Sequence, residues 1–319
     1  MAAGGMAAAP VVATPGRKRR DREAQIAFWV LVSPLLLGLI VFTFVPIGWG
    51  FLISLSQARG TIGLGEWVGI DNYSTMLRDP EFRESLVTIL VFTAFIVPLT
   101  FAVSLGLAML VNGAGWGRPF FRTAFFIPTA ISYVIASLVW KMSIFNGIPS
   151  GAANLLIYEF GFEDPVSWIA STDPAWYWLV LVTVRLWLQV GFYMIIFLAG
   201  LQEIPRDLYE AAYVDGARPG WSTFRNITLP LLRNTSIAVL LLNFIAAFQA
   251  FDEFYNVMGG GLTSGGNISL ARPPLVYLYQ VALGQQDYGR GAAGAFILTA
   301  IIIIVTLVQG RIFGFGRQA

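Results

Sequence analysis

Six apolar runs of membrane-crossing length dominate this sequence and limit what it can fold into. They cover residues 27–55, 86–111, 123–140, 176–200, 235–251 and 292–309. A helix needs about 20 apolar residues to cross a bilayer, where only internal hydrogen bonds can satisfy the backbone. We therefore predict an all-α integral membrane protein with six transmembrane helices.

The composition excludes several classes of protein. Charged residues make up 12% of the chain, against about a quarter in a soluble domain. The absence of His and Cys removes the usual general base, the common metal ligands and any disulfide, so we predict no metal site and no catalytic residue. Lys18 and Lys141 lack the glycines of a phosphate-binding loop, so we expect no cofactor on this chain. A net charge of +2 gives no indication of a nucleic-acid partner.

The same pattern divides the chain. We predict a disordered basic cytoplasmic tail over residues 1–23, a first transmembrane helix and outside loop over 24–84, a transmembrane core with the other five spans over 85–310, and a cytoplasmic tail over 311–319. The uncharged run after residue 23 is too long for a cleaved signal, so we expect a retained span that tilts or bends near Pro34 or Pro46. Residues 142–158 are interrupted by Asn, Gly and Pro, which predicts a loop with a short helix outside the lipid.

The basic residues predict the orientation of the chain. With the N-terminus in the cytoplasm, 13 of the 20 Lys and Arg residues fall in inside segments, six fall outside, and Arg185 lies within a span. Cytoplasmic loops carry the excess of Lys and Arg in membrane proteins. We therefore expect both termini in the cytoplasm, in a multi-pass membrane protein.

The stretch between spans four and five has the features of a surface helix-turn-helix. Pro205 suits a first helical turn, and Leu208, Ala211 and Ala212 are spaced to share one shallow face. Asp215 and Gly216 predict a turn in which the glycine takes a left-handed conformation. We expect a second short helix to start at Pro219, with Trp221 and Phe224 on one side. The alternative is an ordinary amphipathic cytoplasmic loop.

This stretch resembles the EAA motif of binding-protein-dependent ABC importer permeases. The residues that match the motif and its extended form are Glu210, Ala211, Ala212, Asp215, Gly216, Ala217, Phe224, Ile227, Leu229 and Pro230. The resemblance implies that a coupling element docks into a cleft of an ATPase subunit, through Leu208, Glu210, Ala211, Ala212, Asp215 and Gly216. It also implies a second homologous permease subunit, two ATPase subunits that hold the ATP and Mg, an extracytoplasmic substrate-binding protein, and alternating access in membrane lipid.

A second set of residues is similar to the carbohydrate branch of that family. It comprises 251–261, 275–279 and 287–289, with weaker matches at Asn154 and Trp168. Gly260-Gly261-Leu262 departs from the Gly-Gly-Pro of the branch, and a flexible outside loop would also explain these glycines. The resemblance implies a mono- or disaccharide substrate. The alternative is a glycerol-phosphate-type solute, to which Arg185 is the only pointer.

Polar residues within the spans are candidates for the translocation path. Arg185, Gln189 and Tyr193 fall on one helical face, which could line a watery path. Alternatively, Arg185 pairs with an acid such as Asp173 or Asp252. Asn243 and Gln249 could line the path or hydrogen-bond another helix. The predicted spans hold no Asp or Glu, which argues against an ion-coupled secondary transporter and an intramembrane enzyme.

Overall fold

The computed structural model describes residues 17–259 and 267–312, with side chains from residue 22 onward. In this part of the chain all regular elements are helices, apart from two isolated β-bridges. The chain forms two compact units, residues 1–52 and 53–319. Gly260-Gly261-Leu262 lies outside the described residues.

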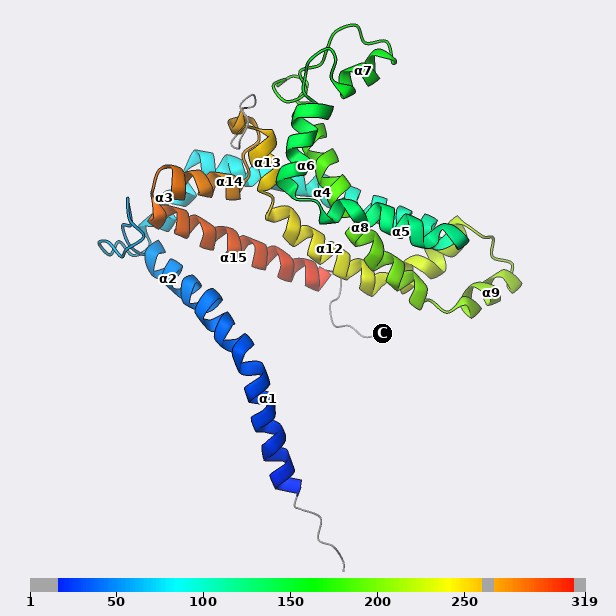
Figure 1. Cartoon of the computed structure of the whole chain (residues 1–319), viewed down its shortest axis with the longest axis horizontal. Coiled ribbons are helices and arrows are strands. Elements are labelled where there is room, and N and C mark those ends of the chain that lie inside the picture. Colours follow the sequence, from blue (N-terminus) through cyan, green and yellow to red (C-terminus); the bar gives the residue numbers. More distant parts are fainter. Residues whose placement is uncertain (1–16, 260–266, 313–319) are drawn as a thin grey trace, which may run out of the picture. The chain divides into compact units, whose positions relative to one another are not determined.

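The long elements follow the apolar runs (Figure 1). They are α1 Arg17–Leu39, α2 Val45–Ser54, α4 Pro80–Gly113, α8 Tyr177–Glu203, α12 Arg233–Phe248 and α15 Tyr288–Ile312. The shorter helices are α3 Asp71–Arg78, α5 Arg118–Phe126, α6 Tyr133–Val139, α7 Ala152–Tyr158, α9 Arg206–Val214, α10 Trp221–Thr223, α11 Leu229–Leu231, α13 Asp252–Val257 and α14 Pro274–Tyr279. Helix α7 is the short helix expected within residues 142–158.

Within the described residues, five helical segments are long and apolar enough to cross a membrane, and a bent pair of helices makes a sixth if it counts as one span. The first segment, Arg22–Ser54, has none of its most apolar window buried inside the chain. It contains a π-helical turn at Ile40–Phe44, between the two prolines at which we expected a bend. A wider turn there is consistent with Pro46, which has no N–H to donate to the preceding turn.

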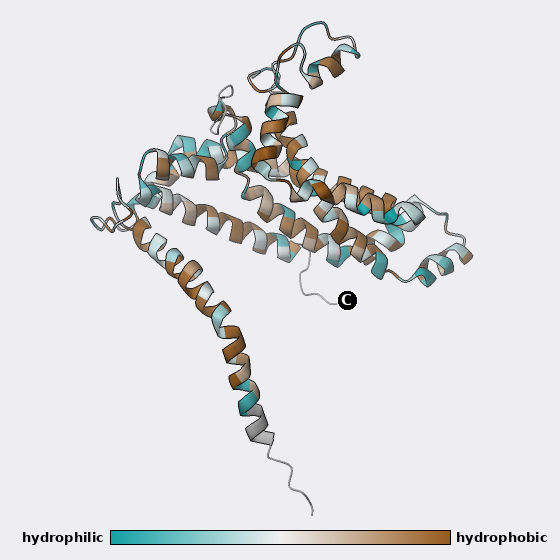
Figure 2. Cartoon of the chain, viewed as in Figure 1, coloured by the Kyte–Doolittle hydropathy of each residue, from teal (hydrophilic) through white to brown (hydrophobic). Residues whose placement is uncertain are grey.

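In the second unit, α4, α8, α12 and α15 pack around a core of large apolar side chains. Phe92 and Phe254 meet edge to face at 4.9 Å between ring centroids, and both are fully buried, as is Leu181. Many apolar side chains of these helices are also exposed, and Figure 2 colours much of the length of the helices as hydrophobic. That distribution suits a protein whose surroundings are lipid.

The span predicted over residues 123–140 is not one straight helix. Helix α5 and a 3₁₀ turn at Ile127–Ala130 form its first half, and α6 with a π turn at Trp140–Ile144 forms its second. The two halves meet at 94°. Ile131 and Ser132 between them are extended, with ψ of 139° and 135°. Apolarity marks depth in the membrane but not the direction of the backbone, so the hydropathy pattern could not predict this break.

Glycine lets α5 lie directly on α8. A Cβ built on Gly191 of α8 would fall 1.8 Å from the carbonyl oxygen of Phe125, far inside any real contact. Only glycine therefore allows this approach. The contact fixes the first half of the broken span against α8 and places its end beside the middle of that helix.

Asp79 precedes the first residue of α4 and forms hydrogen bonds with α4, α14 and α15. Its Oδ1 accepts hydrogen bonds from the backbone N–H groups of Glu81 and Phe82, which caps α4. Its Oδ2 accepts from the hydroxyl of Tyr277 at 2.6 Å and from Nη2 of Arg290 at 2.9 Å. Burial opposes ionisation of Asp79, but these donors outweigh it and hold the pKa of the carboxyl below its usual value. Burial, together with the bond to Asp79, raises the pKa of Tyr277.

We expect Asp79→Asn to lower the free energy of unfolding by roughly 2 kcal/mol at neutral pH, because it removes charge-assisted hydrogen bonds. A carboxyl with a depressed pKa stabilises the fold above its unfolded pKa, and this contribution is lost as the pH falls through the folded value. As the pH is lowered past about 4, the melting temperature of the wild type should therefore drop. The melting temperature of the variant should not show this drop. Glu84→Gln, at an exposed carboxyl in the next turn, is the control. If the melting temperature of Asp79→Asn still dropped in acid, the drop would come from a different titrating group.

Candidate functional site

Helix α9 carries the first half of the predicted coupling element and ends as the sequence indicated. Gly216 has a φ of 86°, in the left-handed region. Its N–H donates to the carbonyl of Tyr213, and the N–H of Ala217 donates to the carbonyl of Ala212 at 2.8 Å. These two bonds form a Schellman motif, which satisfies the last carbonyls of the helix. The glycine therefore fixes the direction in which the chain leaves α9.

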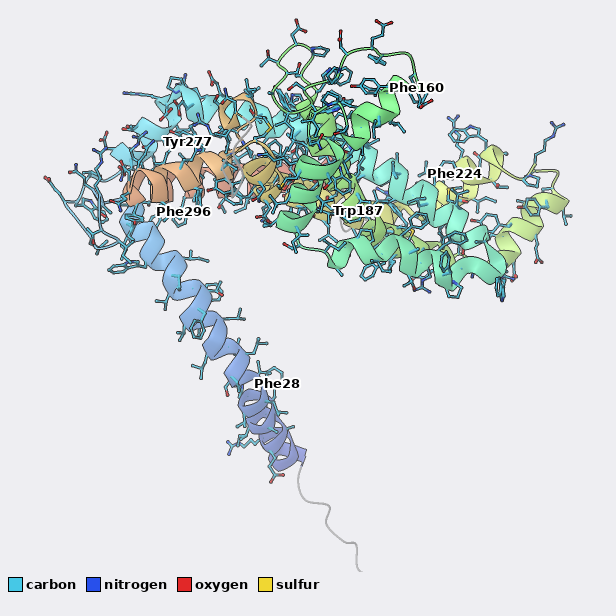
Figure 3. All side chains as sticks on the ribbon, turned by 45° about the horizontal axis from the view of Figure 1, so that its top comes forward. Phe28, Phe160, Trp187, Phe224, Tyr277 and Phe296 are labelled. Carbon is cyan, nitrogen blue, oxygen red and sulfur yellow. The ribbon has the colours of Figure 1, made fainter. Side chains whose placement is uncertain are left out.

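The second half starts two residues later than we predicted. Helix α10 begins at Trp221, because Gly220 has a φ of 108° and separates Pro219 from the helix. The rings of Trp221 and Phe224 then pack with centroids 5.4 Å apart. Figure 3 labels Phe224 on this returning segment. The hydroxyls of Tyr209 and Thr228 lie 2.9 Å apart and join the two halves of the element.

The outer face of α9 is exposed in this chain. Leu208 is 43% exposed, Glu210 and Ala211 are exposed, and Ala212 is partly buried. No residue of α9 is fully buried. On its other side Tyr209 packs on the core of Leu201, Ile204 and their neighbours. A helix held along one side, with an apolar residue and two alanines toward the other, is suited to receive a second protein.

A pocket of about 370 Å³ lies among α8, α12 and the break between α5 and α6. Its lining residues are Thr129, Tyr133, Leu188, Gln189, Phe192, Tyr193, Leu242, Ile245, Ala246 and Gln249. The structure thus brings together three of the predicted path residues, Gln189, Tyr193 and Gln249. The side-chain oxygens of Gln189 and Thr129 are buried without a hydrogen-bond partner. Such atoms can exchange hydrogen bonds with a hydroxylated solute, and the aromatic rings can pack on its apolar faces.

Arg185 lies beside this pocket, in contact with its lining residues Ala246 and Tyr133, and its Nε is buried without a hydrogen-bond partner. It is 5% exposed, and its Nη1 donates to Oε1 of Glu253 at 2.7 Å. Its Nη2 donates to the carbonyl of Ala246, and its guanidinium lies 5.3 Å from the ring centroid of Tyr133. Of the alternatives for Arg185, the structure contains an ion pair, but its partner is Glu253 rather than Asp173 or Asp252. The charge of the arginine is therefore neutralised within the membrane.

The expectation that the spans hold no acid is wrong. The fifth span continues through α13 to Val257 and includes Asp252 and Glu253. Glu253 is 1% exposed. Because it pairs with Arg185, it is not an open ion site of the kind that a secondary transporter needs. Because a buried arginine requires a counter-charge, the acids directly after residue 251 could have indicated from the sequence that this span extends further.

Asn243 lies apart from the pocket. It is fully buried, and its Nδ2 donates to the carbonyl of Val97 on α4 at 3.2 Å. This geometry holds two helices together. Sequence reasoning missed Thr129 and Tyr133, which reach the pocket only because the chain turns between α5 and α6.

Comparison with known proteins identifies the family. Residues 114–313 match the family model described as binding-protein-dependent transport system inner membrane component. The chain is 32% identical to the trehalose/maltose transport system permease protein MalF of Thermococcus litoralis, over 94% of this chain and 98% of that protein. It is 30% identical to the sn-glycerol-3-phosphate transport system permease protein UgpA of Shigella flexneri, over 89% of this chain and 92% of that protein.

A solved structure supports the fold. The crystal structure of a bacterial ABC transporter involved in the import of the acidic polysaccharide alginate contains a chain that matches with a TM-score of 0.79. The identity is 21%, and the match covers 95% of this chain and all of that one. The polypeptide therefore belongs to the family of binding-protein-dependent transport system inner membrane components, as a non-catalytic permease subunit of an ABC importer whose ATP hydrolysis takes place on separate subunits.

Proposed function

We propose that this permease translocates a neutral carbohydrate of the mono- or disaccharide class across a bacterial cytoplasmic membrane. The observation that carries this proposal is the pairing of Arg185 with Glu253 beside the pocket. Because the neighbouring cation is already neutralised, it adds little to the binding of an anionic solute in this pocket. The lining instead offers two amides, hydroxyls and aromatic rings, which suit a polyol with apolar faces.

The names of relatives support the carbohydrate class but leave a second candidate. MalF is named for trehalose and maltose, whereas UgpA is named for sn-glycerol-3-phosphate. A phosphate would require an available cation at the pocket. The ion pair of Arg185 therefore favours the sugar.

The assembly that we propose has one further permease subunit, two ATPase subunits and an extracytoplasmic binding protein. The exposed face of α9 supports a contact with an ATPase subunit. In this assembly, closure of the ATPase dimer moves the coupling helices and the spans open outward by alternating access. Both termini lie in the cytoplasm, as the arginine distribution favours.

The substrate is tested with the complete transporter and its binding protein in proteoliposomes. ATP hydrolysis and uptake are measured with maltose, trehalose, a monosaccharide panel and sn-glycerol-3-phosphate. We expect stimulation by a neutral sugar and none by the phosphate ester. Stimulation by the phosphate ester alone would replace the carbohydrate proposal with the second candidate.

We expect Gln189→Leu to reduce uptake roughly tenfold while the complex still assembles, because the pocket loses one hydrogen-bonding group for the solute. Gln309→Leu is the matched control, since Gln309 lies in α15, outside the pocket, and its side-chain oxygen is likewise buried without a partner. Uptake is measured with radiolabelled sugar, and assembly by size-exclusion chromatography. Equal uptake by the two variants would remove Gln189 from the path.

Single cysteines test the topology, because the native chain has none. Ser222→Cys follows the coupling helix, and Glu163→Cys lies in the segment between α7 and α8. Both native side chains are exposed. We expect a membrane-impermeant maleimide to label residue 163 in intact cells, and residue 222 only after permeabilisation. Labelling of both in intact cells would refute the proposed orientation.

A further inference from the structure

A second pocket, of about 320 Å³, lies beside the first half of the broken span and shares no lining residue with the pocket of Gln189. Its lining residues are Pro119, Arg122, Thr123, Phe126, Ile127 and Ile195. One end is thus basic, and the rest is largely apolar.

Arg122 supplies the positive charge of the lining, and Arg118, which is not a lining residue, precedes it by one helical turn on α5. Arg122 is exposed and forms no ion pair within the described residues. Arg118 donates from Nη2 to the carbonyl of Asn112, while its Nε is buried without a hydrogen-bond partner. No carboxylate lines the pocket. The site therefore offers donors and positive charge to an anion, and guanidinium groups favour phosphate in particular.

The surroundings place this pocket at the edge of a bilayer. Helix α4 ends at Gly113, and its last turns pack with Leu201 at the α9 end of α8. Trp116, in the turn that follows α4, is fully exposed, as expected of a tryptophan at a membrane interface. Phe120 of α5 is 71% exposed. The pocket thus runs from an interfacial, basic end toward an apolar end formed by Ile127 and Ile195.

We propose that this pocket binds one anionic phospholipid, with its phosphate on Arg118 and Arg122 and an acyl chain along Phe126, Ile127 and Ile195. A lipid fits both ends of the site, whereas a free phosphate would use only the basic end. A soluble anionic peptide would leave the apolar end facing hydrocarbon. The lipid comes from the leaflet on the side of α9.

Native mass spectrometry of the full-length chain purified in mild detergent tests this proposal. Phosphatidylglycerol and phosphatidylcholine are titrated in parallel, and retained lipid is counted. We expect the wild type to retain phosphatidylglycerol in preference to phosphatidylcholine. Arg118→Gln combined with Arg122→Gln should weaken retention of phosphatidylglycerol roughly thirtyfold. Each basic residue near an anionic lipid surface strengthens binding about fivefold, and the two factors multiply.

Two controls make the result decisive. Arg218→Gln combined with Arg225→Gln removes two arginines from the coupling element, away from the pocket, and should leave retention unchanged. Arg122→Lys keeps the charge and should retain most of the lipid. Equal loss in both double variants, or in Arg122→Lys and Arg122→Gln, would overturn the proposal. Competition by inorganic phosphate at matched concentration would show a free-phosphate site and overturn it as well. None of these outcomes depends on the transported substrate.

Discussion

Replacing Glu253 with alanine should destabilise the folded permease by about 3–5 kcal/mol, because Arg185 would then be buried without a counter-charge. The pair lies inside the protein, with side chains 6% and 1% exposed, so water cannot replace the missing carboxylate. We expect a lower yield of monodisperse protein and a lower melting temperature in detergent, measured by intrinsic fluorescence.

Two comparisons identify the cause. Asp252→Ala removes the neighbouring acid, which forms no ion pair within the described residues, and should have a small effect. Arg185→Met combined with Glu253→Leu removes both charges and should recover most of the stability, since a buried pair replaced by apolar residues is often neutral. If Glu253→Ala were as stable as Asp252→Ala, the ion pair would not be the stabilising contact that its geometry implies.

Replacing Ala211 with tryptophan should abolish most of the coupling to the ATPase. Ala211 is exposed on α9, so the larger side chain meets no obstacle within this chain. Against a closely fitting partner, an added ring costs on the order of 1–3 kcal/mol, which weakens binding roughly 5- to 150-fold. We expect the ATPase subunit to be lost on co-purification and its stimulation by the binding protein to disappear.

Tyr213→Trp is the matched control for this prediction. Tyr213 lies two residues along α9, on nearly the opposite side of the helix, and is already large and 44% exposed. Because Tyr213→Trp replaces one large ring with another, it should leave the complex with the ATPase subunit intact. Full recovery of the ATPase with Ala211→Trp would show that the face of Leu208 and Ala211 is not the docking surface.

The sequence predicted best those features that depend on local patterns. Apolar runs located the spans because hydropathy reports burial in lipid directly, and Gly216 predicted the end of α9 because a left-handed residue is a local requirement. The start of the second short helix was wrong by two residues, since Gly220 also takes a positive φ and competes with Pro219 as the boundary.

Features that depend on tertiary contacts could not be predicted from the pattern alone. Asp79 meets Tyr277 and Arg290 across about two hundred residues of sequence, and nothing near Asp79 indicates those partners. The pairing of Arg185 with Glu253 depends on the continuation of the fifth span through α13, which the apolar run does not reveal. Gln189 and Gln249 were recognised as polar, but only the turn between α5 and α6 brings Thr129 and Tyr133 beside them.

The 94° turn between α5 and α6 has a mechanical consequence. A continuous helix acts as a rod, and a push at one end reaches the other. Here Ile131 and Ser132 are extended, so no ladder of hydrogen bonds carries rotation or thrust from one half to the other. The segment works as a joint, so α5 and α6 can change their angle to each other while each keeps its own contact with α8, α5 at Gly191 and α6 at Val184 and Leu188. We expect the half of the span formed by α5 and the half formed by α6 to move at different steps of the transport cycle.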